Sequence, residues 1–226
     1  MIKVAMIGVG AISGIYLKNL TETFREVSLI GVCDLIPERA EKGVAFVKEQ
    51  QKKGFQCATP KIYKDMYEAF NDPEVDVVLN ITRPYEHYEV TKQALLHGKH
   101  VFSEKPLGVT MEQCLQAEAA VARHPELVCM LGFMRRYDKS YAYAKEKIAA
   151  GAIGTPYLVK STGIDPEAVV EGAIRYSGTS GGIFLDSAIH DIDLMRWFLG
   201  SEAAEVYALG ATFKHPEFRQ AGQSIL

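Results

Sequence analysis

A glycine-rich segment near the start of the chain constrains its fold more than any other feature. The segment reads Gly8-Val9-Gly10-Ala11-Ile12-Ser13-Gly14; it follows a run of β-forming residues and opens a helical pattern. Such a turn between a strand and a helix is typical of dinucleotide-binding domains, because glycine permits the tight turn and lets the backbone approach a pyrophosphate. The expected cofactor contacts of this turn are Gly8, Gly10, Ala11 and Ile12.

An acidic residue at the end of the second predicted strand bears on the choice of cofactor. Asp34 stands where a carboxylate accepts hydrogen bonds from the adenosine ribose hydroxyls, and where it would repel a 2′-phosphate. This favours NAD over NADP, although Arg39 lies near enough in the sequence to keep NADP open. A structural interpretation is the alternative: the glycines would be turn residues alone, and Asp34 would cap the helix beginning near Pro37.

Short β-rich runs alternate with helical patterns over the first half of the chain. This alternation predicts a parallel sheet covered by helices on both faces. Strands are expected at residues 3–8, 28–34, 75–81, 100–103 and 127–132, and helices at residues 12–20, 37–53, 64–70, 86–96 and 111–121. The first domain is therefore expected to be an α/β domain, a Rossmann-type doubly wound parallel sheet, over residues 1–124.

The pattern changes in the second half of the chain. It predicts a helix at 139–149, a β-like run at 156–162, a long apolar helix at 183–199 and a strand at 205–212. Helices and strands that no longer alternate indicate an α+β domain rather than more of the first sheet. We therefore expect a second, α+β domain over residues 125–226.

Composition and charge exclude several classes of partner. Lys and Arg number 25 against 28 Asp and Glu, so the net charge of −3 gives no electrostatic reason to expect binding to nucleic acid or anionic lipid. The apolar run at residues 127–134 is far shorter than the roughly 20 residues of a membrane-spanning helix, and the N-terminus lacks a signal-peptide pattern. We expect a cytoplasmic protein without nucleic-acid or membrane partners.

A lysine at a strand end is the first candidate catalytic residue. Ligands of open α/β sheets bind beyond the carboxyl ends of the strands, and Ser103-Glu104-Lys105-Pro106 falls at the end of the strand expected at 100–103. A lysine in a solvated turn is the structural alternative.

Polar residues on an apolar helix are the second candidate group. Asp186, His190 and Asp193 are spaced so that they share one face of the helix expected at 183–199. Burying them costs free energy unless they are paired or used in chemistry. A structural His–carboxylate pair and a zinc site are the alternatives, but no cluster of further ligands is evident, so we expect no metal.

The motifs, taken in order, carry a family resemblance over nearly the whole chain. Beyond the glycine-rich turn they are the segments 80–87, 98–107, 132–138 and 181–193, which include Thr82-Arg83-Pro84, Glu104-Lys105-Pro106 and Asp186-Ser187-Ala188-Ile189-His190. The chain resembles the Gfo/Idh/MocA family of oxidoreductases and, within it, the inositol 2-dehydrogenases. Many members have Thr-Pro directly, whereas here Arg83 stands between the two residues.

The resemblance implies an NAD(P)-dependent dehydrogenase that acts on a cyclic polyol or a sugar. It implies that Lys105 lies between substrate and nicotinamide, and that Asp186 and His190 complete the catalytic site. Asp165 is a looser match to the polar residue of the substrate loop, which would make the substrate contacts Lys105, Asp165, Asp186 and His190.

The resemblance also extends the expected cofactor site and the quaternary structure. Thr82, His87, Glu104 and Lys105 would lie near the nicotinamide end of the cofactor. It implies that residues 125–226 form a substrate and oligomerisation domain whose open mixed sheet joins copies into a homo-oligomer and normally continues with several more strands. We therefore expect the second domain of this chain to be truncated.

A secondary alcohol is oxidised by loss of a proton from its hydroxyl and a hydride from its carbon. His190 suits the role of base because an imidazole titrates near neutral pH, and Lys105 suits the stabilisation of the developing alkoxide. Asp186 would orient the imidazole or bind a neighbouring hydroxyl. The alternatives are an NADP(H)-dependent sugar or other reductase of the same family, and a non-catalytic NAD-binding remnant.

Overall fold

The computed structural model describes residues 1–220 and divides the chain into two compact units. The first unit is Met1–Gly132, and the second begins at Phe133. The boundary expected after residue 124 falls before strand β6 (Cys129–Leu131), which pairs with strand β5 (His100–Ser103). The first sheet therefore continues beyond the expected boundary, and the end of the expected second domain, residues 221–226, lies outside the described residues.

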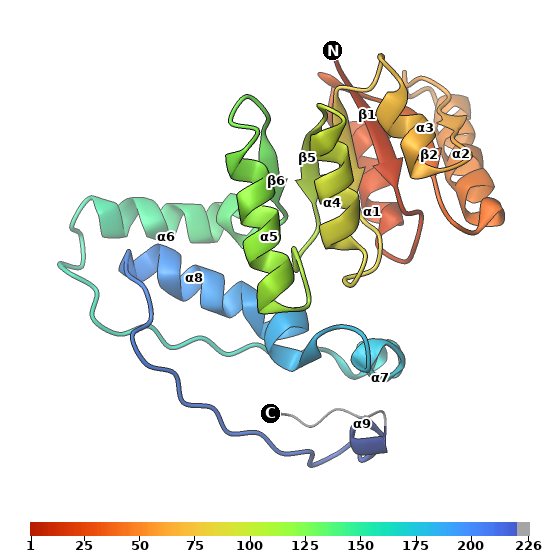
Figure 1. The fold of residues 1–226 in the computed structure, drawn as a ribbon. Helices are drawn as coiled ribbons and strands as arrows, with labels where there is room; N and C mark the ends of the chain where they lie inside the picture. The colour runs from red at the N-terminus through yellow and green to blue at the C-terminus, as the bar shows by residue number, and fades with distance from the viewer. Residues whose placement is uncertain (221–226) are drawn as a thin grey trace. The chain divides into compact units, whose positions relative to one another are not determined.

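The first unit is built on a six-stranded parallel sheet (Figure 1). The remaining strands are β1 (Ile2–Ile7), β2 (Val27–Cys33), β3 (Lys61–Ile62) and β4 (Val77–Asn80). Their order is β3-β2-β1-β4-β5-β6, so the direction of winding reverses between β1 and β4. Ligands of such sheets bind beyond the carboxyl ends of the strands at this reversal.

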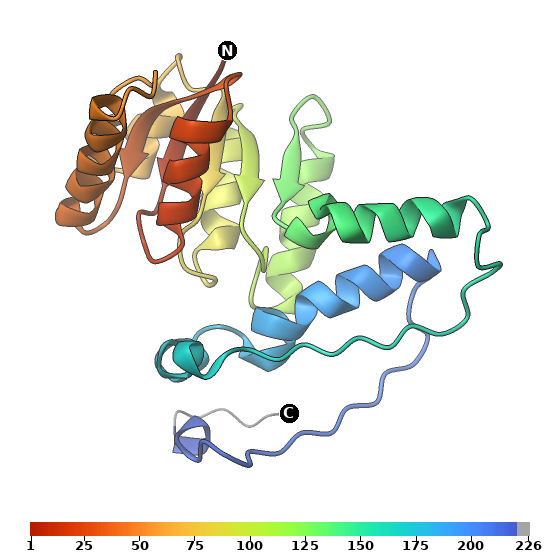
Figure 2. The ribbon, with the colours of Figure 1, turned by 180° about the vertical axis from the view of Figure 1, so that it is seen from behind.

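Helices cover both faces of the sheet, as the alternating pattern predicts. They are α1 (Ser13–Lys18), continued by a π-helical turn over Asn19–Thr23, and α2 (Pro37–Lys52), α3 (Met66–Asn71), α4 (His87–Leu96) and α5 (Met111–Ala122). Helices α1 and α2 lie on one face (Figure 2), and α3, α4 and α5 lie on the other (Figure 1). Local capping fixes several helix starts; for example, the Thr110 side chain accepts a hydrogen bond from the Gln113 N–H.

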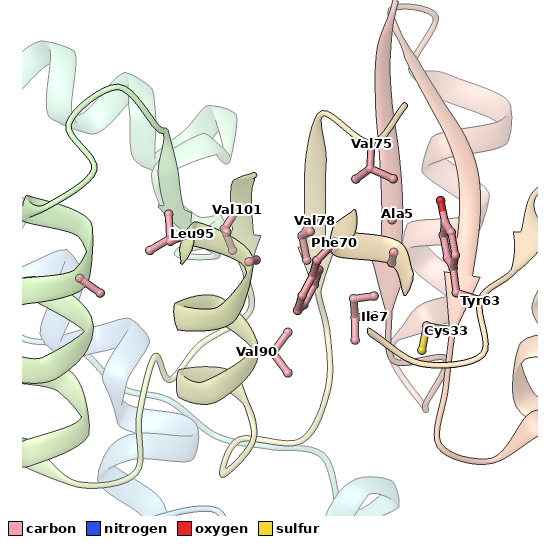
Figure 3. Close-up of a cluster of buried hydrophobic side chains, with 13 residues drawn as sticks. Ala5, Ile7, Cys33, Tyr63, Phe70, Val75, Val78, Val90, Leu95 and Val101 are labelled. Atoms are coloured by element: carbon pink, nitrogen blue, oxygen red, sulfur yellow. The ribbon is translucent and has the colours of Figure 1, made fainter. Parts of the chain in front are cut away.

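The core of the first unit has two layers because successive strand residues point to opposite faces. Ala5 and Ile7 of β1 pack with residues of α3 and α4, such as Phe70 and Val90 (Figure 3). The intervening residues of β1 belong to the second layer, together with residues of β2, α1 and α2. This layer includes Val4 and Met6 of β1, Val32 of β2, Leu17 of α1, and Ala40 and Val47 of α2. The strands therefore read as nearly continuous apolar runs, as expected for strands buried on both faces.

The second unit is mainly helical over its described residues. Its elements are a 3₁₀ turn at Met134–Tyr137, α6 (Lys139–Ala149), a 3₁₀ turn at Glu167–Val169, α7 (Val170–Ser177), a π-helical turn at Phe184–Ala188, α8 (Ile189–Leu199) and α9 (Glu217–Gln220). Helix α6 packs against α8, and Lys145 Nζ donates to the carbonyl oxygen of Trp197 at 2.5 Å.

Two strand predictions in the second unit are wrong. Residues 156–162 and 205–212 form no strand, and no mixed sheet forms among the described residues of this unit. A β-forming segment becomes a strand only when a neighbour accepts its backbone hydrogen bonds. Neither segment has such a neighbour among residues 1–220, and most of their apolar side chains are exposed, with Tyr157 92% and Val206 86% accessible.

Candidate active site

Strand register brings the carboxyl ends of five strands to one level. Ile7 of β1 is paired with Cys33 of β2 and Asn80 of β4; Ser103 of β5 is paired with Asn80 and with Leu131 of β6. The residues that follow these ends therefore line one edge of the sheet, in the order Asp34, Gly8, Ile81, Glu104 and Gly132. This edge carries the predicted cofactor residues of the first unit.

The glycine-rich turn follows β1 and occupies the centre of this edge. Gly8 has a φ of 96°, and its N–H donates to the Cys33 carbonyl at 2.8 Å. A Cβ at Gly8 would lie 2.7 Å from the Ile81 oxygen, whereas a Cβ at Gly10 would meet nothing within 4 Å. Gly8 thus serves close packing between strands, and Gly10 leaves its backbone open to a ligand, which fits a pyrophosphate.

The residues after Gly10 begin helix α1. Ala11 and Ile12 are exposed there, and Ile12 is the N-cap residue, whose side chain makes no capping bond. Ser13 stands at the usual third glycine position; it is buried, and its Oγ donates to the Gly10 carbonyl at 2.7 Å. A small polar side chain at this position therefore stabilises the turn from within.

Asp34 is fixed beside the turn by two backbone hydrogen bonds. Its Oδ2 accepts the Val9 N–H at 2.7 Å, and its Oδ1 accepts the Ile36 N–H at 2.8 Å. The N-cap residue of α2 is Ile36, so Asp34 does not cap that helix as the structural interpretation required. Arg39 lies in the first turn of α2 and is half-buried.

A buried polar network joins the loops that follow β4 and β5. Asn80 Nδ2 donates to the carbonyl of His87 at 2.9 Å, and Asn80 Oδ1 accepts from the Thr82 hydroxyl at 2.7 Å. The His87 ring is 2% exposed; its Nδ1 lies 2.7 Å from the Pro106 oxygen and its Nε2 lies 3.1 Å from the Thr82 oxygen. Both ring nitrogens thus face protein carbonyls, so His87 holds the two loops together.

Burial and hydrogen bonding have opposite effects on the pKa of the His87 ring. Burial lowers the pKa of His87 from its ordinary value, while the hydrogen bonds to Pro106 and Thr82 raise it. A neutral imidazole carries one N–H and donates to one of these carbonyls; the charged ring donates to both.

Lys105 is half-buried in the loop after β5, between two anchored neighbours. Its own N–H donates to Glu104 Oε2 at 3.1 Å. The structure therefore brings Thr82, His87, Glu104 and Lys105 together within the first unit.

One residue of this cluster was missed by the sequence analysis. The Tyr16 hydroxyl of α1 donates to Glu104 Oε1. Tyr16 and Glu104 are far apart in the sequence, and neither the glycine-rich pattern nor the Glu-Lys-Pro segment indicates such a contact.

The predicted polar residues of the second unit do not share one regular helix. Asp186 lies in the π-helical turn at Phe184–Ala188, and His190 lies in the first turn of α8. The i→i+5 bonding of a π-helix changes the relative direction of side chains on either side of the junction. The expected α-helical stripe is therefore corrected to two adjoining elements.

Asp193 has a structural role that the spacing did not reveal. It is 3% exposed, and its two carboxylate oxygens accept from Arg136 Nη2 at 2.7 Å and Nε at 2.8 Å. The neighbouring Asp191 pairs with Arg135 at 2.5 Å. These ion pairs attach α8 to the 3₁₀ turn before α6.

The remaining candidate residues of the second unit lie around the helix junction. Asp186 and His190 are half-buried, and the His190 ring lies edge-on to Phe133 with centroids 6.5 Å apart. The Ser187 hydroxyl donates to Asp165 Oδ2 at 3.4 Å, which brings the loop of Asp165 to the π-helical turn.

Two kinds of feature are absent from residues 1–220. Within this range no group of three His, Cys, Asp or Glu side chains is placed to hold a metal ion. No helix of the same range is long and apolar enough to cross a membrane.

The sheet order, the open backbone at Gly10 and the fixed Asp34 carboxylate define a dinucleotide-binding protein of the Rossmann type. Comparison with known protein families identifies the class more closely. A family model described as "Oxidoreductase family, NAD-binding Rossmann fold" matches residues 2–133. A model described as "GFO/IDH/MocA C-terminal domain" matches residues 141–225. The chain belongs to the Gfo/Idh/MocA oxidoreductase family, as the sequence predicted, and its first unit is an NAD-binding domain.

Several inositol dehydrogenases resemble the chain along most of its length. The scyllo-inositol 2-dehydrogenase (NAD(+)) of Bacillus subtilis is 33% identical over 98% of this chain and 60% of its own length. The myo-inositol 2-dehydrogenase of Thermotoga maritima is 31% identical over 97% of this chain and 61% of its own length.

The fold is also similar to that of a solved inositol dehydrogenase structure. The scyllo-inositol dehydrogenase of Lactobacillus casei, with bound NAD(H) and scyllo-inositol, superposes with a TM-score of 0.86 at 32% identity, over 98% of this chain and 63% of that one. The chain thus spans about 60% of the length of the curated relatives it matches.

Proposed function

We propose that this protein is an NAD-dependent dehydrogenase that oxidises a secondary alcohol of a cyclic polyol of the inositol type. The observation that carries the proposal is that Asp34, the Gly10 backbone and Lys105 lie beyond the carboxyl ends of β2, β1 and β5, at one edge of the same sheet. The relatives named as inositol dehydrogenases support the substrate class.

The cofactor contacts follow from the first unit. Gly10, Ala11 and Ile12 would contact the pyrophosphate, Gly8 would permit the turn that presents them, and Asp34 would bind the adenosine ribose. Thr82, His87, Glu104 and Lys105 would form the nicotinamide end of the site, with His87 acting through the loops it holds. NAD, when bound, supplies the acceptor for the hydride.

The catalytic roles are assigned by chemistry. His190 takes the proton of the substrate hydroxyl, because a neutral imidazole is a base near working pH. Lys105 donates to the same oxygen and stabilises the negative charge that develops on it. Asp186 orients His190 or accepts a hydrogen bond from a neighbouring hydroxyl, and Asp165 binds a further hydroxyl of the ring.

Formation of NADH from a panel of inositols and aldoses, measured by absorbance with NAD and with NADP, tests the proposal. We expect turnover of at least one inositol, with a larger kcat/KM for NAD than for NADP. A larger value for NADP, with reduction of a sugar, would favour the reductase. NADH binding without turnover of any polyol would favour a non-catalytic NAD-binding protein.

The oligomeric state and the cellular location of the protein can also be inferred. We infer a homo-oligomer and a cytoplasmic location, which rest on the sequence and on the family. Light scattering during gel filtration measures the first, and cell fractionation the second.

Replacement of Asp34 by alanine is expected to raise the Kd of NADH about tenfold, since a hydrogen bond to a charged group is lost. The Kd of NADPH should fall, because the charge that repels its 2′-phosphate is gone. Asp34→Asn is the matched control, as it keeps an acceptor for the Val9 N–H but removes the charge. Fluorescence titration measures both constants, and an unchanged Kd of NADH in Asp34→Ala would contradict the ribose assignment.

A further inference from the structure

A tyrosine of α1 reaches the loop that carries Lys105. The Tyr16 hydroxyl donates to Glu104 Oε1, and the Tyr16 ring packs edge-on against Phe102 of β5, with centroids 6.2 Å apart at 67°. Tyr16 belongs to the helix that directly follows the glycine-rich turn. A single side chain thus links the nucleotide-binding helix to the end of β5.

The Glu104 carboxylate passes this link on to Lys105. Its second oxygen, Oε2, accepts the backbone N–H of Lys105 at 3.1 Å. A Cβ at Gly132 would lie 3.3 Å from the same oxygen, so the bare glycine after β6 leaves the space in which the carboxylate sits. The Glu104 N–H donates to the Asn80 carbonyl at 2.9 Å, which fixes its backbone to β4.

The other side of Lys105 is anchored independently. The Pro106 carbonyl lies 2.7 Å from Nδ1 of the buried His87 ring. The backbone around Lys105 is therefore held on one side by His87 of α4 and on the other by Tyr16 of α1, which acts through Glu104. Helix α1 is the one that follows the glycine-rich turn.

The chemistry of Tyr16 suits a fixed donor. Burial, followed by the hydrogen bond to Glu104, raises the pKa of Tyr16 above its ordinary value. The hydroxyl therefore stays protonated over the working pH range, which makes Tyr16 a donor to Glu104 and unsuitable as a general base.

We propose that Tyr16 is a positioning residue that sets the place and the charge environment of Lys105 through the Glu104 carboxylate. Its hydroxyl neutralises part of the Glu104 charge and directs the carboxylate toward the Lys105 N–H. Without the hydroxyl, the Glu104 carboxylate carries more of its negative charge beside Lys105, and the loop loses its tie to α1. The catalytic consequence rests on the proposed function, whereas the effect on Lys105 itself does not.

The chain offers a matched control for the removal of this hydroxyl. Tyr63 also donates to a carboxylate, Asp72 Oδ2, at 2.8 Å, and burial together with that carboxylate likewise raises its pKa. Tyr63 follows β3, which is separated from β5 by β2, β1 and β4. Tyr16→Phe and Tyr63→Phe therefore remove the same kind of bond from the same domain, but only the first touches the Lys105 loop.

The first experiment needs no cofactor or substrate. The full chain is labelled with acetic anhydride over a range of pH, and the acetylation rate of Lys105, relative to that of the exposed Lys42, is followed by mass spectrometry. In Tyr16→Phe we expect the Lys105 profile to move upward in pH, since a less neutralised carboxylate in the neighbouring residue favours the ammonium form. Tyr63→Phe should match the parent protein.

The second experiment measures turnover. In Tyr16→Phe we expect kcat for the polyol to fall about tenfold through loss of alignment, while KM and the Kd of NADH change less than about threefold. Tyr63→Phe should keep the kcat of the parent. If the parent itself shows no turnover, the proposed function fails, while the labelling profile still decides the role of Tyr16.

Two results would overturn the proposal. One is a Lys105 profile in Tyr16→Phe that coincides with that of the parent; the other is an equal displacement in Tyr63→Phe, which would indicate a general loss of stability. Glu104→Gln provides a variant of opposite sign if Tyr16→Phe does not fold. Removal of the carboxylate charge should move the Lys105 profile downward, and failure to do so would also contradict the proposal.

Discussion

Lys105→Met is expected to lower kcat for polyol oxidation about a thousandfold while the Kd of NADH changes less than about threefold. Methionine keeps the length of the side chain but cannot donate to the alkoxide, and loss of one such donor typically costs a factor of this size. The backbone of the loop should stay in place, because Glu104 and the Pro106 carbonyl hold it without the lysine side chain. Single-turnover kinetics and NADH fluorescence measure the two quantities.

Replacement of the proposed base, His190 of the second unit, should also lower turnover. His190→Gln should lower kcat by a comparable factor, since a general base contributes on the order of a hundred- to ten-thousandfold.

The chain offers a control lysine for the Lys105→Met variant. Lys92→Met, in α4 beside Glu89, removes a lysine of the same domain and should leave kcat unchanged. Unchanged turnover in Lys105→Met or in His190→Gln would refute the role of that residue. A loss of NADH affinity as large as the loss of kcat would instead make Lys105 a cofactor-binding residue alone.

The parallel sheet could be predicted because its strands are apolar on both faces and each lies between a turn signal and a helical pattern. Val4, Ala5, Met6 and Ile7 illustrate this, since alternate residues enter the two core layers. Strand β3 escaped prediction because its two residues, Lys61 and Ile62, are exposed and carry no pattern.

The errors in the second unit have one physical origin. The segments 156–162 and 205–212 have β-forming composition, but composition does not supply the neighbouring strand that a sheet requires. Likewise, helical spacing placed Asp193 with Asp186 and His190, whereas its partner, Arg136, is distant in the sequence. Local pattern indicates which residues are polar, and tertiary contacts decide which of them are already paired.

Gly8→Ala is expected to destabilise the first unit by about 3 kcal/mol, whereas Gly10→Ala should change its free energy of unfolding by less than about 0.5 kcal/mol. Gly8 has a φ of 96°, which alanine adopts with strain, and its new Cβ would lie 2.7 Å from the Ile81 oxygen between β1 and β4. Gly10 has open space at the same atom. Urea unfolding followed by circular dichroism measures both changes.

The two variants exchange their ranking when NADH binding is measured. Gly10→Ala should raise the Kd of NADH at least about tenfold, because its methyl group occupies the space through which the backbone approaches the pyrophosphate. Gly8→Ala should lose binding only in proportion to the unfolded fraction, so that a stabilising osmolyte restores it. If Gly10→Ala kept the parent's Kd, the open backbone at Gly10 would not be the pyrophosphate site. If Gly8→Ala kept the parent's stability, the packing of the turn against β4 would not be what requires glycine there.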